Sequence, residues 1–304
     1  MLHRPVELAP FCGKFDSLTA EVAANPGFEK FVVEYERLIG YRHGSGRVGS
    51  MTERILSFYE PLADHYHLIF DDWNETIERQ AKILNPLLAA QMHGYPLRIL
   101  DCACGIGTQA LGLAGFGHQV TASDLSRAQV NRAKHEAERL ALDISFHISD
   151  MTSLTEITDR DFHVVAALVN ALPHLTADQL RRAVGAAGSK LKSNGLFIAS
   201  IRDYDTLILE RPATQEPAFY GGKGDRRIIH QVWDWIDAGR YTLHLYITME
   251  SEQMWTTHHF VSEYRCLLRN ELSTVLQSSG FREVRWLMPA QSGFYQPLVL
   301  ARRV

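Results

Sequence analysis

A glycine-containing turn between a predicted strand and a predicted helix is the segment of this sequence best suited to bind a ligand. In LRILDCACGIGTQAL (97–111), a buried strand leads into Asp101, and Gly105 and Gly107 open a turn before the helix. Glycines let a bulky ligand approach the backbone, and the free N–H groups at a helix start favour an anionic group. With Ala110 the turn also satisfies the pattern G-x-G-x-x-A, so a nicotinamide or flavin site is an alternative.

Three aspartates at successive predicted strand ends narrow the choice of ligand. Asp101 stands directly before the turn, where a carboxylate would repel a pyrophosphate but could hold an ammonium group. Asp124 ends the next strand and could accept hydrogen bonds from both hydroxyls of a ribose. Asp150 ends the strand after that, beside Met151, where the carboxylate could accept from an adenine amine while the thioether packs on the ring. Each aspartate alone could be a helix cap or turn former, but together they predict one crevice.

Alternating strands and helices must position these side chains. Apolar runs over 97–102, 119–123, 144–148, 163–169 and 196–201 alternate with helical spacing, for instance after a possible Ser126 cap, which predicts a parallel sheet covered on both faces. An earlier helix is expected from a cap at Asn74, with a kink at Pro86. The remaining predicted elements are an antiparallel meander (227–236, 241–250 and 255–264), a helix (270–279) and a last strand pair (281–288 and 296–302).

Composition and charge exclude several classes of protein. Lysine and arginine total 31 against 35 acidic residues, a net charge of −4 that is scattered along the chain and argues against a nucleic-acid partner. No apolar stretch approaches the roughly 18 residues that a membrane span needs, so no membrane partner is expected. The four cysteines suggest no disulfide framework, and the sequence start shows no signal-peptide core. We therefore expect a cytoplasmic protein with a small-molecule substrate and no metal site.

The glycine turn and the three aspartates resemble those of the class I S-adenosylmethionine-dependent methyltransferases, from about residue 55 to the end. The resemblance implies an α/β fold with a Rossmann-like seven-stranded methyltransferase sheet, helices on both faces and a reversed final hairpin, here with an antiparallel meander and an N-terminal helical extension. It implies S-adenosyl-L-methionine as cofactor, with Asp101 at the methionine part, Asp124 at the ribose and Asp150 at the adenine. The other cofactor-binding residues expected are Tyr59, Trp73, Ala103, Gly105, Gly107, Leu125, Met151 and Asn170.

Three further segments resemble the glycine and sarcosine N-methyltransferases: FYEPLADHYHLIFDDW (58–73), ALVNALPHL (167–175) and IASIRDYD (198–205). The first is similar to that family's aromatic lid. The other two imply that Asn170 lies at the substrate and that Arg202 clamps its carboxylate. An arginine at a strand end can offer a planar two-donor fork, which a lysine cannot copy. The alternatives are that Arg202 pairs at the surface with Asp203 or Asp205, and that Asn170 caps the next turn.

Aromatic residues and one histidine complete the predicted site. Aromatic faces and oxygens can stabilise a sulfonium and its methyl group, although most aromatic residues in a chain of this size pack in the core. His174 is a candidate base for an amine, which could also lose its proton to solvent. The residues predicted to be catalytic are Tyr66, Asn170, His174 and Tyr220, and those predicted to bind substrate are Asn170, Arg202, Tyr204, Tyr220 and Tyr264.

These observations predict an N-methyltransferase that acts on a small amino acid or another carboxylate-bearing amine by in-line methyl transfer, giving S-adenosylhomocysteine. An alternative is an enzyme that uses the cofactor without methyl transfer, for example a cyclase that forms azetidine-2-carboxylate and methylthioadenosine. A non-catalytic cofactor-binding module is a third hypothesis. Residues 51–304 are expected to form the methyltransferase domain, with a lid at about 55–95 and a substrate-side meander at about 225–265. Residues 1–50 are expected to be an extension that covers the site or joins subunits of a homo-oligomer.

Overall fold

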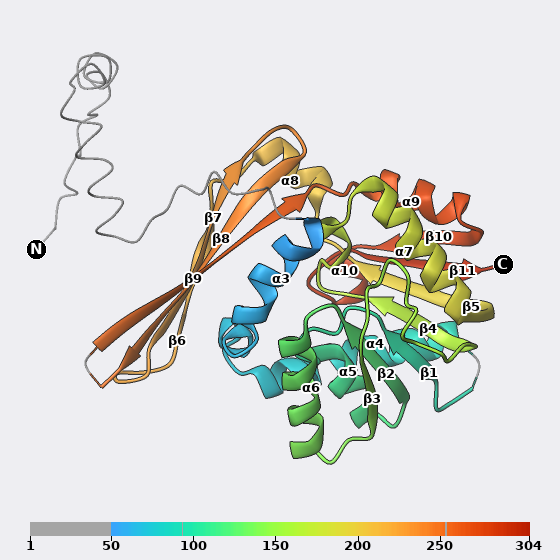
Figure 1. Ribbon diagram of the computed structural model, residues 1–304, viewed down its shortest axis with the longest axis horizontal. Coiled ribbons are helices and arrows are strands. Elements are labelled where there is room, and N and C mark those ends of the chain that lie inside the picture. Colours follow the sequence, from blue (N-terminus) through green and yellow to red (C-terminus); the bar gives the residue numbers. More distant parts are fainter. Residues whose placement is uncertain (1–49, 93, 253) are drawn as a thin grey trace, which may run out of the picture. The chain divides into compact units, whose positions relative to one another are not determined.

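A seven-stranded sheet organises the computed structural model, which describes residues 50–92, 94–252 and 254–304 (Figure 1). The strands are β1 (Arg98–Asp101), β2 (Gln119–Asp124), β3 (Ile144–Ile148), β4 (Phe162–Ala167), β5 (Leu191–Ser200), β10 (Phe281–Leu287) and β11 (Leu298–Arg303). Their order is β10-β11-β5-β4-β1-β2-β3. Strands β1 to β5 are parallel, whereas β11 runs antiparallel to both β5 and β10. The predicted α/β sheet with a reversed final hairpin is confirmed.

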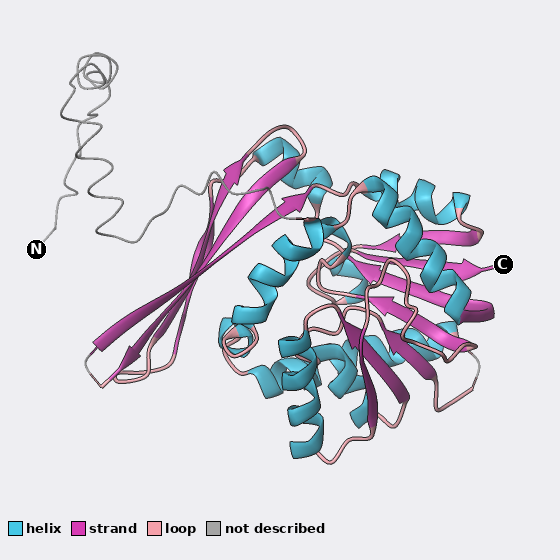
Figure 2. Ribbon diagram, viewed as in Figure 1, coloured by secondary structure: helices cyan, strands magenta, loops and turns pink. Residues whose placement is uncertain are grey.

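Helices cover both faces of this sheet because successive residues of a strand point to opposite sides. Ile99 and Val164 pack with α4 (Trp73–Gln91) and α5 (Thr108–Gly115), which contact each other. Leu100 and Val165 pack on the other face with α7 (Ala177–Lys190) and α9 (Arg269–Ser278). Helix α6 (Arg127–Arg139) contacts α5, β2 and β3. Figure 2 shows the helices on the two sides of the strands.

Side-chain caps fix where the helices begin. The Ser126 hydroxyl accepts a hydrogen bond from the Gln129 N–H at 3.2 Å and caps α6, as the sequence predicted. The predicted cap of α4 at Asn74 is wrong: Asp72 accepts from the Glu75 N–H at 3.0 Å, and the helix starts at the following residue. Pro86 lies inside α4 and does not end it.

A second, antiparallel sheet of four strands stands beside the first (Figure 1). It contains β6 (Thr214–Tyr220), β7 (Arg227–Trp235), β8 (Arg240–Ser251) and β9 (Met254–Arg265), paired in that order. The three strands predicted for the meander correspond to β7, β8 and β9, and β6 was not predicted. In β8 the alternate residues Tyr241, Leu243, Leu245 and Ile247 are buried, so one face of this sheet joins the core.

Helix α3 (Met51–Leu62) lies against both α6 and β9, and it leads into the 3-10 turn η1 (Tyr66–Ile69). The shorter elements are η2 (Leu172–His174), α8 (Tyr204–Glu210) and α10 (Pro289–Ser292). Over the described ranges there is no helix long and apolar enough to cross a membrane, and no cluster of three or more potential ligands arranged for a metal ion. The extension expected before residue 50 lies outside the described residues.

Candidate functional site

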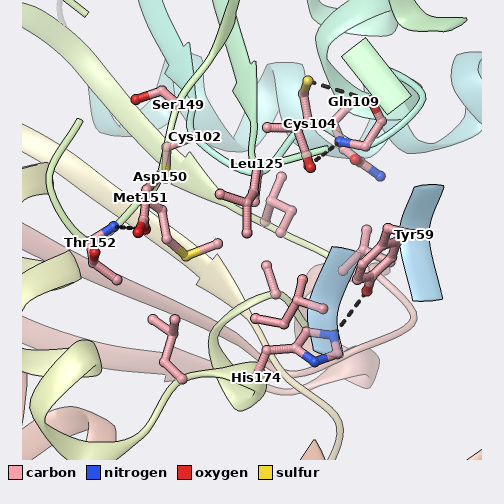
Figure 3. A pocket seen from close by; sticks show the side chains of 18 of the residues that line it. Tyr59, Cys102, Cys104, Gln109, Leu125, Ser149, Asp150, Met151, Thr152 and His174 are labelled. Atoms are coloured by element: carbon pink, nitrogen blue, oxygen red, sulfur yellow. Dashed lines mark hydrogen bonds between the residues drawn. The ribbon is translucent and has the colours of Figure 1, made fainter. Parts of the chain in front are cut away.

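A first cavity opens at the carboxyl ends of β1 to β4, where the predicted strand-end residues meet (Figure 3). Helix α3 contributes one wall and the loop after β3 contributes another. In Figure 3 the Met151 thioether lies inside this cavity, beside Asp150 and Leu125. The residues expected to bind the cofactor that line it are Tyr59, Ala103, Gly105, Asp124, Leu125, Asp150 and Met151.

Asp124 ties the glycine turn to the next strand. The Gly105 N–H donates to its Oδ2 and the Ser126 N–H donates to its Oδ1, each at 2.9 Å. Burial raises the pKa of Asp124 even though these backbone hydrogen bonds act to lower it. Each carboxylate oxygen has a second lone-pair site, so Asp124 can accept from a ligand hydroxyl while holding the turn.

Asp101 lies just behind the cavity wall formed by its neighbours Cys102 and Ala103. The side chain is almost fully buried, and only its Oδ1 has a described partner, the Ala103 N–H at 3.4 Å. The other oxygen is buried without a hydrogen-bond partner, and burial raises the pKa of Asp101 to about 7. A buried oxygen in this state is a position where a ligand donor is expected, and an ammonium group fits it.

Two other predicted cofactor residues, Gly107 and Trp73, lie outside the lining of the first cavity and support residues that form it. Gly107 is the N-cap of α5 with φ of 95°, a conformation that favours glycine, and it does not line the cavity. Trp73, also expected at the cofactor, does not line the first cavity. Its buried indole donates to Thr108 Oγ1 at 2.9 Å, and Thr108, not Trp73, faces the cavity.

A second cavity of about 660 Å³ adjoins the first. It lies between the ends of β4 and β5 and the buried face of the four-stranded sheet. Tyr59, Tyr66, Phe70 and Val169 line both cavities and therefore form their common boundary. The predicted substrate residues that line the second cavity are Asn170, Arg202, Tyr220 and Tyr264.

Arg202 is enclosed by aromatic side chains and has no carboxylate partner among the described residues. Its Nη1 donates to the Tyr241 hydroxyl at 2.6 Å and its Nη2 to Gln231 Oε1 at 3.4 Å. The guanidinium carbon lies 4.8 Å from the ring centre of Trp233 and 5.3 Å from that of Tyr264.

The surface ion pair that the sequence left open for Arg202 is not formed. Asp203 and Asp205 both pair with Arg269, at 2.6 and 3.4 Å. The charge of Arg202 is thus available to a ligand in the second cavity.

Asn170 and Tyr204 hold Arg202 in place through their side-chain hydrogen bonds. The Arg202 N–H donates to Asn170 Oδ1, and Asn170 Nδ2 donates to the Tyr204 hydroxyl, each at 3.0 Å. The Tyr204 hydroxyl lies 3.2 Å from that of Tyr241, which closes a ring of hydrogen bonds. The prediction that Tyr204 contacts substrate is corrected: its side chain is fully buried and lines neither cavity.

His174 lies in the wall of the first cavity, where its Nε2 is 3.0 Å from the Tyr59 hydroxyl (Figure 3). Burial and the charge of Arg202 lower the pKa of His174 to about 3. A ring with this pKa stays neutral and is a weak base, so the structure argues against the predicted base role. The arrangement instead holds Tyr59 at the boundary between the cavities.

Sequence reasoning missed the residues that surround Arg202 from the second sheet: Gln231, Trp233 and Tyr241. They occupy inward positions of β7 and β8, and Trp233 stacks on Tyr241 with ring centres 4.6 Å apart. The period of two in the predicted meander strands was the signal that could have found them.

Comparison with known proteins shows what the central part of the chain is similar to. A family model described as a methyltransferase domain matches residues 99–195, which run from β1 into β5. A ubiquinone biosynthesis O-methyltransferase of Coxiella burnetii is 28% identical over 148 residues, 47% of this chain and 62% of the relative. The matched segment therefore spans less than two thirds of that relative.

Solved structures share the fold over most of the chain. DesVI of Streptomyces venezuelae superposes with a TM-score of 0.65 at 19% identity, covering 80% of this chain and 98% of that protein. CalS10, an amino pentose methyltransferase from Micromonospora echinaspora with S-adenosylmethionine bound, gives 0.63 at 16% identity, with 81% and 98% covered. These structures show that the chain shares their fold, while the narrower resemblance to glycine and sarcosine enzymes stays a prediction.

Proposed function

We propose, on the premise that this chain carries a class I S-adenosylmethionine-dependent methyltransferase domain, that it methylates the amine of a small acceptor that also bears a carboxylate. Asp101 would hold the ammonium of the cofactor, Asp124 its ribose hydroxyls and Asp150 its adenine amine. S-adenosylmethionine supplies an activated methyl group on a positively charged sulfur. The site is suited to this ligand because Asp124 and Asp150 line the first cavity at strand ends, and Asp101, at the end of the neighbouring strand, has a buried oxygen without a described partner.

The observation that carries the choice of acceptor is the unpaired guanidinium of Arg202 in the second cavity. A partly buried charge without a counter-ion is costly, and an anionic ligand that fits the planar fork would offset that cost. Tyr264 links this position to the first cavity, because its ring lies 5.3 Å from the guanidinium carbon and 4.2 Å from the ring centre of His174. A carboxylate on Arg202 would therefore place a nearby amine close to the boundary between the cavities.

The side chains at this boundary would act by positioning and by excluding water. Burial raises the pKa values of the Tyr59 and Tyr66 phenols well above that of a free tyrosine, so both phenols stay neutral. Their oxygens could accept weak C–H···O contacts from a polarised methyl group. Because His174 is a weak base here, the acceptor amine would lose its proton to solvent before it attacks. Asn170 would set the direction of the Arg202 backbone.

The second cavity favours methyl transfer over the cyclase hypothesis. A cyclase that rearranges the cofactor alone needs no room for another substrate, whereas a cavity of about 660 Å³ adjoins the cofactor residues. The unpaired Arg202 in that cavity likewise supports a separate acceptor.

Purified protein incubated with methyl-labelled S-adenosylmethionine and a panel of amino acids and amino sugars tests the proposal. Mass spectrometry is expected to find an N-methylated amino acid and S-adenosylhomocysteine. Methylthioadenosine formed without an acceptor would support the cyclase, and tight cofactor binding without any product would support the binding module.

Replacing the clamp gives a sharper test. Arg202→Ala is expected to raise the acceptor KM by roughly 10- to 100-fold, the effect of losing hydrogen bonds to a charged group, with little change in cofactor affinity. Arg211→Ala is the control, because Arg211 lies on the surface, over Trp235 and bonded to the Asp237 carbonyl. An unchanged acceptor KM in the Arg202 variant would show that the carboxylate lies elsewhere.

A further inference from the structure

We infer that the acceptor is an α-amino acid with a large apolar or aromatic side chain, and that glycine and sarcosine are poor acceptors. This inference rests on the proposed function and specifies its substrate class. It follows from what lines the second cavity beyond Arg202.

The floor of the second cavity is a strip of the four-stranded sheet that is apolar except for Gln231. From Trp233, which lies under the guanidinium, the inward positions of β7 lead through Gln231 to Ile229. At a rise of about 3.4 Å per residue, this strip is roughly 14 Å long. Leu243 pairs with Trp233 and Leu245 with Gln231, so two leucines lie alongside it.

Charged groups do not compete for this strip. Of the two acidic residues that line the cavity, Asp203 is paired with Arg269 and Glu216 is on an exposed strand. Arg202 is the one guanidinium among the lining residues. The second cavity thus offers one guanidinium at one end and the apolar side chains of Trp233, Ile229, Leu243 and Leu245 on its floor, while polar residues such as Thr206, Thr214, Gln215, Glu216, His230 and Gln296 lie elsewhere in its lining. A carboxylate attached to an apolar body would match the guanidinium and this floor.

The size of the cavity leads to the same substrate class. About 660 Å³ lies within the range of sites that enclose drug-sized ligands, and glycine on Arg202 would leave most of it filled with water. A large side chain would displace that water and gain the burial of its own apolar surface. An amine on the carbon next to the carboxylate suits this geometry, because the Tyr264 ring centre lies 5.3 Å from the Arg202 guanidinium carbon and 4.2 Å from the His174 ring in the wall of the first cavity.

Acceptors that differ in one feature test the inference. Glycine, L-leucine and L-phenylalanine share the amine and the carboxylate. Phenethylamine keeps the amine and the aromatic body without the carboxylate. An amino sugar keeps the amine but has neither the carboxylate nor the aromatic body. We expect kcat/KM for L-phenylalanine or L-leucine to exceed that for glycine by about 10- to 100-fold, the range expected for burying such a side chain. Binding of each compound to the complex with S-adenosylhomocysteine, measured by calorimetry, should give the same order without requiring turnover.

A variant that fills the space above the strip tests recognition of the apolar side chain independently of recognition of the carboxylate. Ala218 is half-buried on β6, pairs with Ile229 and lines the cavity. Ala218→Phe should lower kcat/KM for L-phenylalanine by tenfold or more, and by a clearly larger factor than it lowers that for glycine. Thr248→Phe is the matched control, because Thr248 neighbours the buried Ile247 on β8 and points to the opposite face. If Ala218→Phe loses its fold by circular dichroism, Ala218→Leu takes its place.

The outcomes distinguish the two levels of the proposal. If glycine is the best acceptor and Ala218→Phe affects all amino acids equally, the inference about a large apolar side chain is overturned, but the proposed binding of the carboxylate by Arg202 is not. If phenethylamine or the amino sugar is preferred to every amino acid and Arg202→Ala changes nothing, the proposed function itself fails. Absence of binding by every amino acid to the S-adenosylhomocysteine complex would overturn both.

Discussion

Asp101 combines burial, a partnerless oxygen and a raised pKa, and these three properties determine how its charge responds to pH. Burial, with a smaller contribution from Asp124, raises its pKa from 3.8 to about 7, so the folded protein binds a proton here that the unfolded chain releases above about pH 4. The stability from this proton is fully present below pH 3.8 and is lost as pH rises through about 7. A ligand ammonium would favour the ionised form and compensate that loss.

We therefore expect affinity for S-adenosylhomocysteine to increase as pH is raised from 5.5 and to level off above about 7. Asp101→Asn should weaken binding at pH 8 by roughly 10- to 100-fold, because the charged hydrogen bond is lost, and should flatten the pH dependence. Calorimetric titrations at constant ionic strength measure both effects. A steep pH dependence that survives in the asparagine variant would assign it to another group.

Tyr241 is a positioning residue whose hydroxyl can be removed without disturbing its ring. The ring is stacked between Trp233 and Tyr264, while the hydroxyl accepts from Arg202 Nη1. Tyr241→Phe keeps the stacking and frees the guanidinium, so we expect the acceptor KM to rise by about 3- to 10-fold with kcat and cofactor affinity little changed.

Tyr246→Phe is the matched control on the same strand, since Tyr246 lies on the opposite face and stacks on His230 and His259. Steady-state kinetics in both substrates separate the two variants. A fall in kcat alone for Tyr241→Phe would mean that the hydroxyl acts on the reaction and not on acceptor binding.

The residues at strand ends could be predicted from the sequence, but the direction of side chains that tertiary contacts determine could not. Asp124 and Asp150 line the first cavity because carboxyl ends of neighbouring parallel strands meet at one edge of a sheet. Tyr204, in contrast, follows a strand end yet turns into the core, because Asn170 and Tyr241 bind its hydroxyl. Local sequence does not encode that choice, since both partners lie more than thirty residues away along the chain.

At the scale of elements, Gly112 determines how closely α4 and α5 approach. A Cβ at this position would lie 2.7 Å from the Ala81 Cβ and 2.9 Å from the Ile77 carbonyl oxygen, so the two helices would have to separate. Gly115 lies in the same helix with open space around it. Gly112→Ala is expected to lower the melting temperature by several degrees, whereas Gly115→Ala should leave it unchanged or raise it slightly.

Differential scanning calorimetry of the two variants measures this contrast. Because α5 begins at the glycine turn, Gly112→Ala should also weaken binding of S-adenosylhomocysteine, and Gly115→Ala should not. Equal melting temperatures for the two variants would show that the α4 and α5 contact adapts easily to an added methyl group.

The strands of the central sheet were predictable, and β6 was not, for a physical reason. Buried parallel strands are continuous runs of small and apolar residues, which is why the predicted run 119–123 agrees with β2, buried at four consecutive residues, to within one residue. The sequence of β6, TQEPAFY, is mostly exposed and carries Pro217, which is typical of an edge strand and weakens any strand signal. Its pairing with β7 shifts register between Gln215 and Ala218, where the proline lies.

At the scale of the whole described unit, α3 and η1 connect the two sheets. Glu60 of α3 accepts from Ser126 Oγ at 2.9 Å at the start of α6, and Arg54 pairs with Glu263 of β9 at 3.5 Å. Past η1, the Phe70 carbonyl accepts from Arg227 of β7 at 3.2 Å. The segment that carries Tyr59 and Tyr66 is thus held from both sides, and it lines both cavities.

This shared wall predicts that the two ligands bind cooperatively. A ligand in the first cavity would contact Tyr59, Tyr66 and Phe70, so any rearrangement of these side chains that it favours would also change the affinity of the second cavity. We expect S-adenosylhomocysteine to raise the affinity for the preferred amino acid by about 5- to 100-fold, and by linkage the amino acid must raise the affinity for S-adenosylhomocysteine by the same factor. Calorimetry in both orders of addition measures the two factors.

Glu60→Gln, which weakens the contact between α3 and α6, should reduce both factors equally. Glu78→Gln on the exposed face of α4 is the control. Independent binding in the unmodified protein would mean that neither ligand rearranges the shared wall.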